Sequence, residues 1–323
     1  MFLQFIIPYY GSADQLIAAV SSVLYQTDTN NIGLIIVDDN HFNDEGREQS
    51  TKACLFLNEH RNDGVNITYI KNDENLGVGK TRNVGLAAAT AEWISFIDSD
   101  DVIDKEFVSF FREKASTKKF NTFVGKYSSS FDGHRFIDNA ITWLHGKVYK
   151  LSFLRYNGIV FPPLRFNEDG GFNLMVYEMS RRIFTYEEDK ILYSWNNNEN
   201  SLTKKNTKKE YSAVNYIKSS TFAFGHIFKK YELNQSQRLS ATIFQIYLFY
   251  IQLLYHDRPV EETEQAIYVF FNAIRKTEWY KSKKIKKSFE HLFTSKYMIE
   301  PCIGEMTIGQ FIRKFEKEPI NFK

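Results

Sequence analysis

The chain of 323 residues has little cysteine and no long apolar segment. Cys54 and Cys302 are too few for a disulfide framework or a structural zinc site, and such sparse use is typical of a reducing compartment. The longest apolar run, within residues 243–255, is interrupted by Gln245 and Gln252, whereas a bilayer span needs roughly 20 apolar residues. The first residues lack the basic segment and cleavage site of a signal peptide. We therefore expect a cytoplasmic protein.

The motifs of several enzyme classes are also missing. The seven histidines show no His-Glu-x-x-His spacing and no serine has the glycine flanks of a nucleophile elbow, which argues against metalloproteases and hydrolases of those types. Residues 79–81 read Gly-Lys-Thr, but Glu74 stands where a P-loop needs glycine, and Arg82 stands where the dinucleotide fingerprint needs its third glycine. What remains is a glycine-bearing helix start, typical either of a generic anion site or of a solvated helix.

The net charge of +2 conceals an uneven distribution. Residues 1–204 carry an acidic balance of −6, so we expect no nucleic-acid partner there, while residues 205–323 carry +8. Residues 279–287 contain five lysines: Lys281, Lys283, Lys284, Lys286 and Lys287. This cluster fits either a solvated face or a peripheral contact with the inner face of the membrane.

The first 125 residues alternate between strand-like and helix-like patterns. Strands are expected at 2–7, 34–37, 65–70, 92–97 and 121–124, and helices at 13–25, 45–60, 78–91 and 105–115. We expect Pro8 to end the first strand and Ser12 to cap the first helix. Strands separated by helices of this length predict an α/β fold with a mostly parallel central sheet.

A polar stretch near residue 205 predicts a domain boundary. Before it, from about residue 126 to Trp195, the pattern loosens into short strands and turns. After it, helical spacing recurs at 211–231, 239–256, 261–279 and 308–315. We therefore expect one α/β domain at 1–205 and a mostly helical accessory domain at 206–323, which would serve acceptor access, homo-oligomer assembly or membrane association.

Carboxylates follow two of the predicted strands. Asp38-Asp39 ends the second strand, and Asp98-Ser99-Asp100 follows the fourth. Ligands of open parallel sheets bind beyond the carboxyl ends of the strands, so these segments are expected to converge. Asp98 and Asp100 suit a divalent cation that also holds a diphosphate, or else they cap the helix that begins near Lys105.

Two further acidic positions leave alternatives open. The carboxylate of Asp39 could accept the ring N–H of uracil, or it could form an Asx-turn after its strand. Glu168-Asp169, beside two glycines, could supply a general base, or it could simply begin a helix.

The order of these segments resembles the family 2 glycosyltransferases of GT-A fold, of the type that makes bacterial polysaccharides and glycoconjugates. The resemblance covers residues 1 to about 205. It rests on Pro8-Tyr9, Asp38-Asp39, Asn75 with Gly77, Arg82-Asn83, Asp98 with Asp100, Glu168-Asp169, the Gly146–Lys150 segment, and Tyr193-Ser194-Trp195.

The resemblance implies transfer of a hexose or N-acetylhexosamine, with inversion, from a UDP-sugar to a hydroxyl of a glycan, glycoprotein or lipid-linked acceptor. It also implies a role for each matching residue. Pro8, Tyr9 and Asp39 would hold the nucleobase, and the rest of the nucleotide-sugar would be held by Asn75, Arg82, Asp98 and Ser99. Asp100, with Asp98, would hold a Mn²⁺ or Mg²⁺ ion. Asp169, with Glu168 as the alternative, would be the catalytic base that accepts a proton. Asn196 stands where many relatives carry an arginine.

Two other functions use the same residues. One is a non-catalytic module that binds nucleotide-sugars or serves as a scaffold, and the other is a metal-dependent nucleotidyltransferase. The missing P-loop weakens the second. The acidic pair at 168–169 argues against the first, because a module without catalysis has no need of a base.

Overall fold

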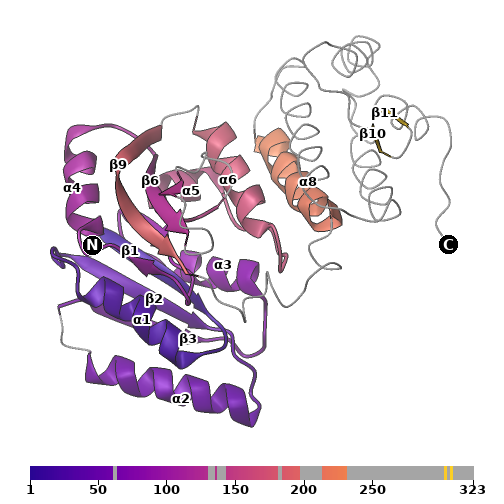
Figure 1. Ribbon diagram of the computed structural model, residues 1–323. Helices are drawn as coiled ribbons and strands as arrows, with labels where there is room; N and C mark the ends of the chain where they lie inside the picture. Colours follow the sequence, from indigo (N-terminus) through magenta and orange to yellow (C-terminus); the bar gives the residue numbers. More distant parts are fainter. Residues whose placement is uncertain are drawn as a thin grey trace. The chain divides into compact units, whose positions relative to one another are not determined.

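The computed structural model describes residues 1–60, 64–129, 135–136, 143–180, 184–196, 213–230, 302–303 and 306–307. The chain divides into two compact units, Met1–Lys205 and Asn206–Lys323 (Figure 1). The site predicted from the sequence lies wholly in the first unit.

The first unit is built around a mixed sheet. Along the chain its elements are β1 (Leu3–Tyr9), α1 (Ala13–Leu24), β2 (Ile32–Asp38), α2 (Asp44–Glu59), β3 (Asn66–Lys71), α3 (Val78–Ala88), β4 (Trp93–Phe96), β5 (Val102–Ile103), α4 (Phe107–Thr117), β6 (Thr122–Ser129), β7 (Arg135–Phe136), β8 (Lys147–Lys150), α5 (Leu151–Asn157), α6 (Glu168–Met179) and β9 (Phe184–Trp195). The strand order is β3-β2-β1-β4-β8-β6-β9-β5, with β7 paired to β6.

The two halves of this sheet differ in strand direction. β3, β2, β1 and β4 pair in parallel, whereas β8 runs antiparallel to both β4 and β6, and β5 runs antiparallel to β9. The α/β class is confirmed, but the sheet is fully parallel only over β3, β2, β1 and β4. Among the later strands β6 and β9 also pair in parallel, with α5 and α6 in the connection between them, whereas the short strands β5, β7 and β8 pair antiparallel.

Strands β1, β2 and β4 are buried on both faces, which is why their sequences are nearly continuous apolar runs. Leu3, Phe5 and Ile7 share one hydrophobic cluster with α1, α2 and α4. Alternate residues point to the other face, where α3 packs so closely that a Cβ at Gly85 would lie 2.4 Å from the Ile6 side chain. Only glycine permits this approach of the helix to the sheet.

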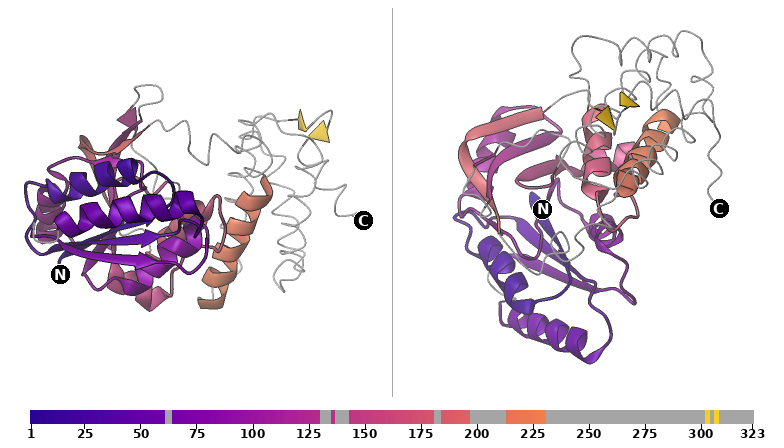
Figure 2. Two further views of the ribbon diagram at one scale, coloured as in Figure 1. Left: turned by 90° about the horizontal axis from the view of Figure 1, so that it is seen from below. Right: turned by 45° about the vertical axis from the view of Figure 1, so that its right-hand side comes forward.

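Helices α1 and α2 lie side by side over one face of the parallel half (Figure 1), and the view from below in Figure 2 shows both covering that face. Ser12 occupies the N-cap position of α1, as expected, but its side chain makes no capping hydrogen bond. At α2 the side chain of Asn43 does cap, because its Oδ1 accepts the Gly46 N–H at 2.9 Å.

Pro8 does not end the first strand, contrary to the sequence-based expectation. β1 continues through Pro8, which pairs with Val37, to Tyr9. β4 pairs with Leu3–Ile6, so beyond Ile6 the strand has, among the described residues, a ladder partner on one side only. A proline is tolerated at such an edge position.

In the second unit the structure describes one helix, α8 (Ala213–Lys230), and the strand pair β10 (Cys302–Ile303) and β11 (Met306–Thr307). α8 confirms the helix expected at 211–231. The helices expected at 239–256, 261–279 and 308–315, and the lysine cluster of 279–287, lie outside the described residues. None of the described helices is long and apolar enough to cross a membrane.

Candidate active site

The carboxyl ends of the parallel strands meet at one edge of the sheet, as the sequence predicted. Asp39 directly follows β2, and its N–H donates to the carbonyl of Tyr9 at the end of β1. The loop after β3 contacts Asp39, and Arg82 on α3 contacts Asp98 after β4. We call Asp39, Asn75, Arg82, Asp98 and Glu168 the carboxyl-end cluster.

Asp39 fastens the loop that leads into α3. Its carboxylate accepts the side-chain amide of Asn72 at 2.8 Å and the backbone N–H groups of Leu76 and Gly77 at 2.8 and 2.9 Å. Asn75 in turn donates its amide to the Asp39 carbonyl at 2.8 Å. The Asx-turn considered for Asp39 occurs instead at Asp38, whose Oδ1 accepts the Asn40 N–H at 2.8 Å.

Asp38 is fully buried beneath this edge and has several hydrogen-bond donors. Besides Asn40, its carboxylate accepts the Lys71 ammonium at 3.0 Å and the hydroxyl of Tyr69. Asp38 therefore stabilises the ends of β2 and β3 from within.

Glycines bring α3 close to the segment that precedes α6. Gly77 at the N-cap has φ +80°, a backbone conformation that favours glycine. A Cβ at Gly79 would lie 2.6 Å from the carbonyl oxygen of Pro162 and 3.3 Å from Cβ of Glu168. This close packing explains the glycines of the Gly-Val-Gly-Lys segment without a P-loop, and it places Arg82 against Glu168.

Arg82 joins two carboxylates that the sequence analysis assigned to different tasks. One terminal nitrogen donates to Asp98 Oδ1 at 2.5 Å and the other donates to Glu168 Oε1. The side chains of Arg82 and Glu168 are 5% and 8% exposed, against 34% for Asp98. The guanidinium also lies 5.5 Å from the centre of the Phe161 ring. A buried cation thus links the strand-end turn to the start of α6.

The charges around Arg82 shift one another's pKa values. Burial favours the neutral form of Asp98, but Arg82 and then His145 outweigh it and hold the pKa of this carboxyl below its ordinary value. Burial, reinforced by Asp169, raises the pKa of Glu168 to about 7 despite the opposing effect of Arg82. Burial likewise raises the pKa of Asp169. The Arg82 guanidinium therefore favours the ionised form of all three carboxyl groups, but the pKa values of Glu168 and Asp169 on α6 stay above their ordinary values.

Glu168 and Asp169 begin α6, so the helix-start alternative describes their position correctly. They differ in what holds them. Glu168 is engaged by Arg82, whereas half-buried Asp169 accepts the Gly170 N–H at 2.8 Å and forms no salt bridge with any residue that the structure describes. Of the two, Asp169 is therefore better placed to take a proton from a substrate.

Asp98, Ser99 and Asp100 form a turn that is closed by the Asp101 N–H, which donates to the Asp98 carbonyl at 3.0 Å. They do not cap α4, which begins only at Phe107. The Asp101 carboxylate fastens this turn to the end of β9, because it accepts the Tyr193 hydroxyl at 2.6 Å and the Asn196 N–H at 2.8 Å. The Asn196 amide also donates to the Asp100 carbonyl at 2.9 Å.

A possible metal site adjoins this turn. Potential ligand atoms of Asp98, Asp101 and His145 lie within 4.8 Å of one another, whereas Asp100 is not part of this group. His145 is buried, and burial lowers its pKa to about 4, so the ring is neutral and able to bind a metal. Its Nδ1 has no hydrogen-bond partner among the described residues. Two carboxylates and an imidazole with a free nitrogen fit a divalent cation.

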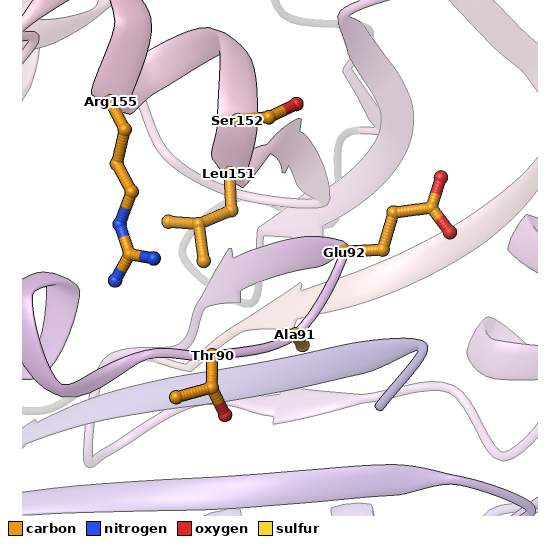
Figure 3. A pocket seen from close by; sticks show the side chains of 6 residues that line it. All are labelled: Thr90, Ala91, Glu92, Leu151, Ser152 and Arg155. Carbon is orange, nitrogen blue, oxygen red and sulfur yellow. The ribbon is translucent and has the colours of Figure 1, made fainter.

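The opposite end of β4 carries ionisable groups of a different kind. There Thr90, Ala91 and Glu92 precede the strand, and an open cavity of ≈ 370 Å³ is lined by these residues together with Leu151, Ser152 and Arg155 (Figure 3). Arg155 donates to the carbonyl of Ala89 at 2.6 Å, and Glu92 lies 3.9 Å from the Lys150 ammonium. These charged groups are largely exposed.

A comparison with protein families identifies the chain, because residues 4–184 match the model described as glycosyl transferase family 2. This match covers more than half of the chain. The protein belongs to glycosyl transferase family 2. It is therefore assigned to an enzyme family, and the resemblance inferred from the sequence is confirmed.

Relatives of this family 2 chain include the glycosyltransferase GlyA of Streptococcus pneumoniae serotype 4, which is 27% identical over 63% of this chain and 32% of that protein. A poly(ribitol-phosphate) beta-glucosyltransferase of Bacillus spizizenii is 28% identical over 57% of this chain and 30% of that protein. The chain thus spans about a third of the length of these curated relatives.

The crystal structure of S. aureus TarS 1–349 in complex with UDP-GlcNAc superposes with a TM-score of 0.70 at 18% sequence identity. The match covers 91% of this chain and 86% of that one. This likeness confirms the GT-A fold of the family 2 chain.

The family 2 site differs from the sequence-based assignment in one aromatic residue. Pro8 and Tyr9 lie within β1, and the Tyr9 ring is fully buried in the hydrophobic core. This ring therefore does not reach a nucleobase at the edge of the sheet. The ring that is exposed here belongs to Tyr10, which contacts His41 edge-on at 5.8 Å.

Sequence reasoning missed His145 and Asp101. His145 stacks on Tyr193 at 4.9 Å and reaches Asp98 only because β8 lies antiparallel beside β4. A histidine 47 positions from its neighbour leaves no spacing signal. Asp101 did carry a signal, as the fourth residue of Asp-Ser-Asp-Asp, but its role became visible only with β9 in place.

Proposed function

We propose that this family 2 glycosyltransferase transfers a hexose or N-acetylhexosamine from a UDP-sugar to a hydroxyl group of a glycan acceptor, with inversion at the anomeric carbon. The observation that carries the proposal is the buried Arg82, which links Asp98 of the strand-end turn to the Glu168-Asp169 pair of α6. This link brings Asp98, which suits a metal–diphosphate site, and the acidic pair of α6, which can supply a catalytic base, to the same edge of the sheet.

Asp169 is proposed as the catalytic base. Its carboxylate takes the proton of the acceptor hydroxyl while the hydroxyl oxygen attacks the anomeric carbon, and the bond from that carbon to the diphosphate oxygen breaks. The nucleoside diphosphate leaves with the electron pair of that bond. Attack from the face opposite to the leaving group produces inversion. Glu168, engaged by Arg82, positions the start of α6.

A divalent cation is part of the proposal. From the sequence, Asp98 and Asp100 would hold it; the donor atoms that converge in the structure add Asp101 and His145. Mn²⁺ or Mg²⁺ bound there supplies Lewis-acid chemistry that offsets the charge of the departing diphosphate. The role of Asp100 is tested by substitution to alanine, for which we expect weaker Mn²⁺ binding and slower transfer. Unchanged Mn²⁺ affinity in this variant would leave Asp98, Asp101 and His145 as the ligands.

The names of the relatives and the solved structure support the choice of donor and acceptor. One relative is a poly(ribitol-phosphate) glucosyltransferase, and the TarS structure contains UDP-GlcNAc. We therefore propose UDP-glucose or UDP-GlcNAc as donor. A polyol-phosphate chain is the first acceptor to test, ahead of glycoprotein and lipid-linked acceptors. The cytoplasmic location, homo-oligomer assembly and a membrane contact through residues 279–287 stay predictions.

The test is release of UDP from each UDP-sugar by the full chain, with Mn²⁺ and with or without poly(ribitol phosphate). We expect release that depends on the acceptor and stops with excess chelator. Binding of UDP-sugar without release under any condition would favour the non-catalytic module. Release of pyrophosphate from a nucleoside triphosphate would favour the nucleotidyltransferase.

A further inference from the structure

The Arg82 guanidinium, which the family resemblance assigned to the nucleotide-sugar, is already engaged by carboxylates in this structure, and only its buried Nε lacks a hydrogen-bond partner among the described residues. Arg82 uses both terminal nitrogens for Asp98 and Glu168, and only 5% of its side chain is exposed. Its positive charge is already balanced by two carboxylates. A diphosphate would have to displace one of them and leave a buried carboxylate without its partner, which is costly.

Arg165 lies at the same edge and is exposed. It stands in the segment between α5 and α6, three residues before Glu168. Its stem lies against Gly77, where a Cβ would come within 3.0 Å of Arg165 Cγ, and its guanidinium donates to Asn75 Oδ1 at 3.4 Å. Arg165 therefore extends over the two residues that Asp39 holds at the start of α3.

The charge of Arg165 is not balanced in the described part of the chain. No described carboxylate lies within salt-bridge distance of it, and its one hydrogen bond goes to a neutral amide. Arg82 and Arg112, by contrast, each pair with carboxylates. Asn196, which follows β9 and stands where many relatives carry an arginine, is neutral and donates to Asp100 and Asp101. It therefore offers no positive charge to a phosphate.

We propose that Arg165, rather than Arg82, binds the diphosphate of the nucleotide donor. The proposal rests on the proposed function and names a specificity-determining residue for it. A guanidinium presents two parallel N–H groups that match phosphate oxygens, and Asn75 beside it adds a polar side chain to the same place. Arg82 is then a positioning residue, which acts through Asp98 and Glu168.

The donor is favoured over a phosphate group of the acceptor because of what Arg165 touches. Asn75 and Gly77 are held by Asp39 at the end of β2, on the side of the sheet where the nucleotide is expected.

The experiment is a calorimetric titration of the full chain with UDP, GDP and UMP in the presence of Mn²⁺. It compares wild type with Arg165→Gln, Arg165→Lys and the control Arg155→Gln, an exposed arginine at the other end of β4 (Figure 3). We expect Arg165→Gln to weaken UDP binding about ten- to a hundred-fold and UMP binding less, because a charge-assisted hydrogen bond is lost. Arg165→Lys should fall in between, and Arg155→Gln should match wild type. An unchanged melting temperature of Arg165→Gln excludes a merely structural role.

The outcomes separate this inference from the proposed donor. If wild type binds UDP and Arg165→Gln binds it equally well, the Arg165 inference is wrong and the UDP donor stands. If wild type prefers GDP and Arg165→Gln weakens GDP binding, the inference stands and the UDP donor is wrong. If wild type binds no nucleoside diphosphate, both are wrong. A loss confined to transfer onto a phosphate-bearing acceptor, with UDP affinity intact, overturns the donor assignment of Arg165.

Discussion

The two ends of strand β4 carry ionisable residues under opposite conditions. At the carboxyl end, Arg82 and Glu168 are almost fully buried and joined in one ion-pair network with Asp98. At the amino end, Glu92 and Lys150 are 54% and 37% exposed and 3.9 Å apart. Burying charges costs free energy that exposed charges do not cost, so stability alone does not explain the carboxyl-end cluster. Its arrangement is what the proposed reaction needs.

The largest loss of stability is expected when Arg82 at the carboxyl end is replaced. Arg82→Gln leaves Glu168 buried and Asp98 partly buried without a counter-charge, so the free energy of unfolding should fall by about 3–5 kcal/mol. The matched control is Lys52→Gln, which removes the exposed Lys52–Asp14 pair of 2.6 Å and should cost at most about 1 kcal/mol. Urea denaturation measures both. Equal losses in the two variants would refute the distinction between buried and exposed pairs.

The pH dependence of the free energy of unfolding tests the buried state of Glu168. Its pKa in the folded state is about 7, above the ordinary value of 4.5. Between these values the folded chain binds more protons than the unfolded chain, so the contribution of Glu168 to stability is greatest below pH 4.5 and is lost as the pH rises to 7. Across this window Glu168 should lower the free energy of unfolding by up to about 3 kcal/mol.

Glu168→Gln isolates this contribution, because glutamine does not titrate. As the pH rises from 4.5 to 7, the free energy of unfolding of wild type should therefore fall relative to that of Glu168→Gln. A difference that stays constant from pH 4.5 to 7 contradicts the raised pKa.

Asp39 tests how the carboxyl-end cluster holds the nucleotide. Asp39→Asn weakens the attachment of Leu76 and Gly77, so we expect a loss of UDP affinity of about 1.5–3 kcal/mol. If Asp39 acts through this loop, the affinity for CDP, whose base has no ring N–H, falls equally, and the preference for UDP over CDP is kept. If it accepts the uracil N–H instead, that preference disappears. Competition binding of the two nucleotides distinguishes the roles.

The smallest effect is expected at the amino end of β4. Glu92→Gln removes only an exposed, long ion pair, so the free energy of unfolding should change by less than about 0.5 kcal/mol and UDP binding should not change. A large effect of this variant on UDP affinity would show that the two ends are not independent.

Much of this comparison was predictable from the sequence, for physical reasons. The runs of β1, β2 and β4 and the helical spacing of α1 are local signals, and the carboxyl-end rule for parallel sheets then placed Asp39 and Asp98 together. The partners of Arg82 were not predictable, because Glu168 lies 86 residues away and the contact depends on the packing permitted by Gly79. The continuation of β1 through Pro8 likewise depends on how far β4 extends beside it.

The central claim is that Asp169 acts as the catalytic base and does not hold the donor nucleotide. Asp169→Asn tests it most directly, because asparagine keeps the shape but cannot take a proton. With UDP-glucose or UDP-GlcNAc, Mn²⁺ and poly(ribitol phosphate), transfer should slow about 10²- to 10⁴-fold, while calorimetry shows UDP affinity unchanged. Transfer by Asp169→Asn at the wild-type rate would contradict the account.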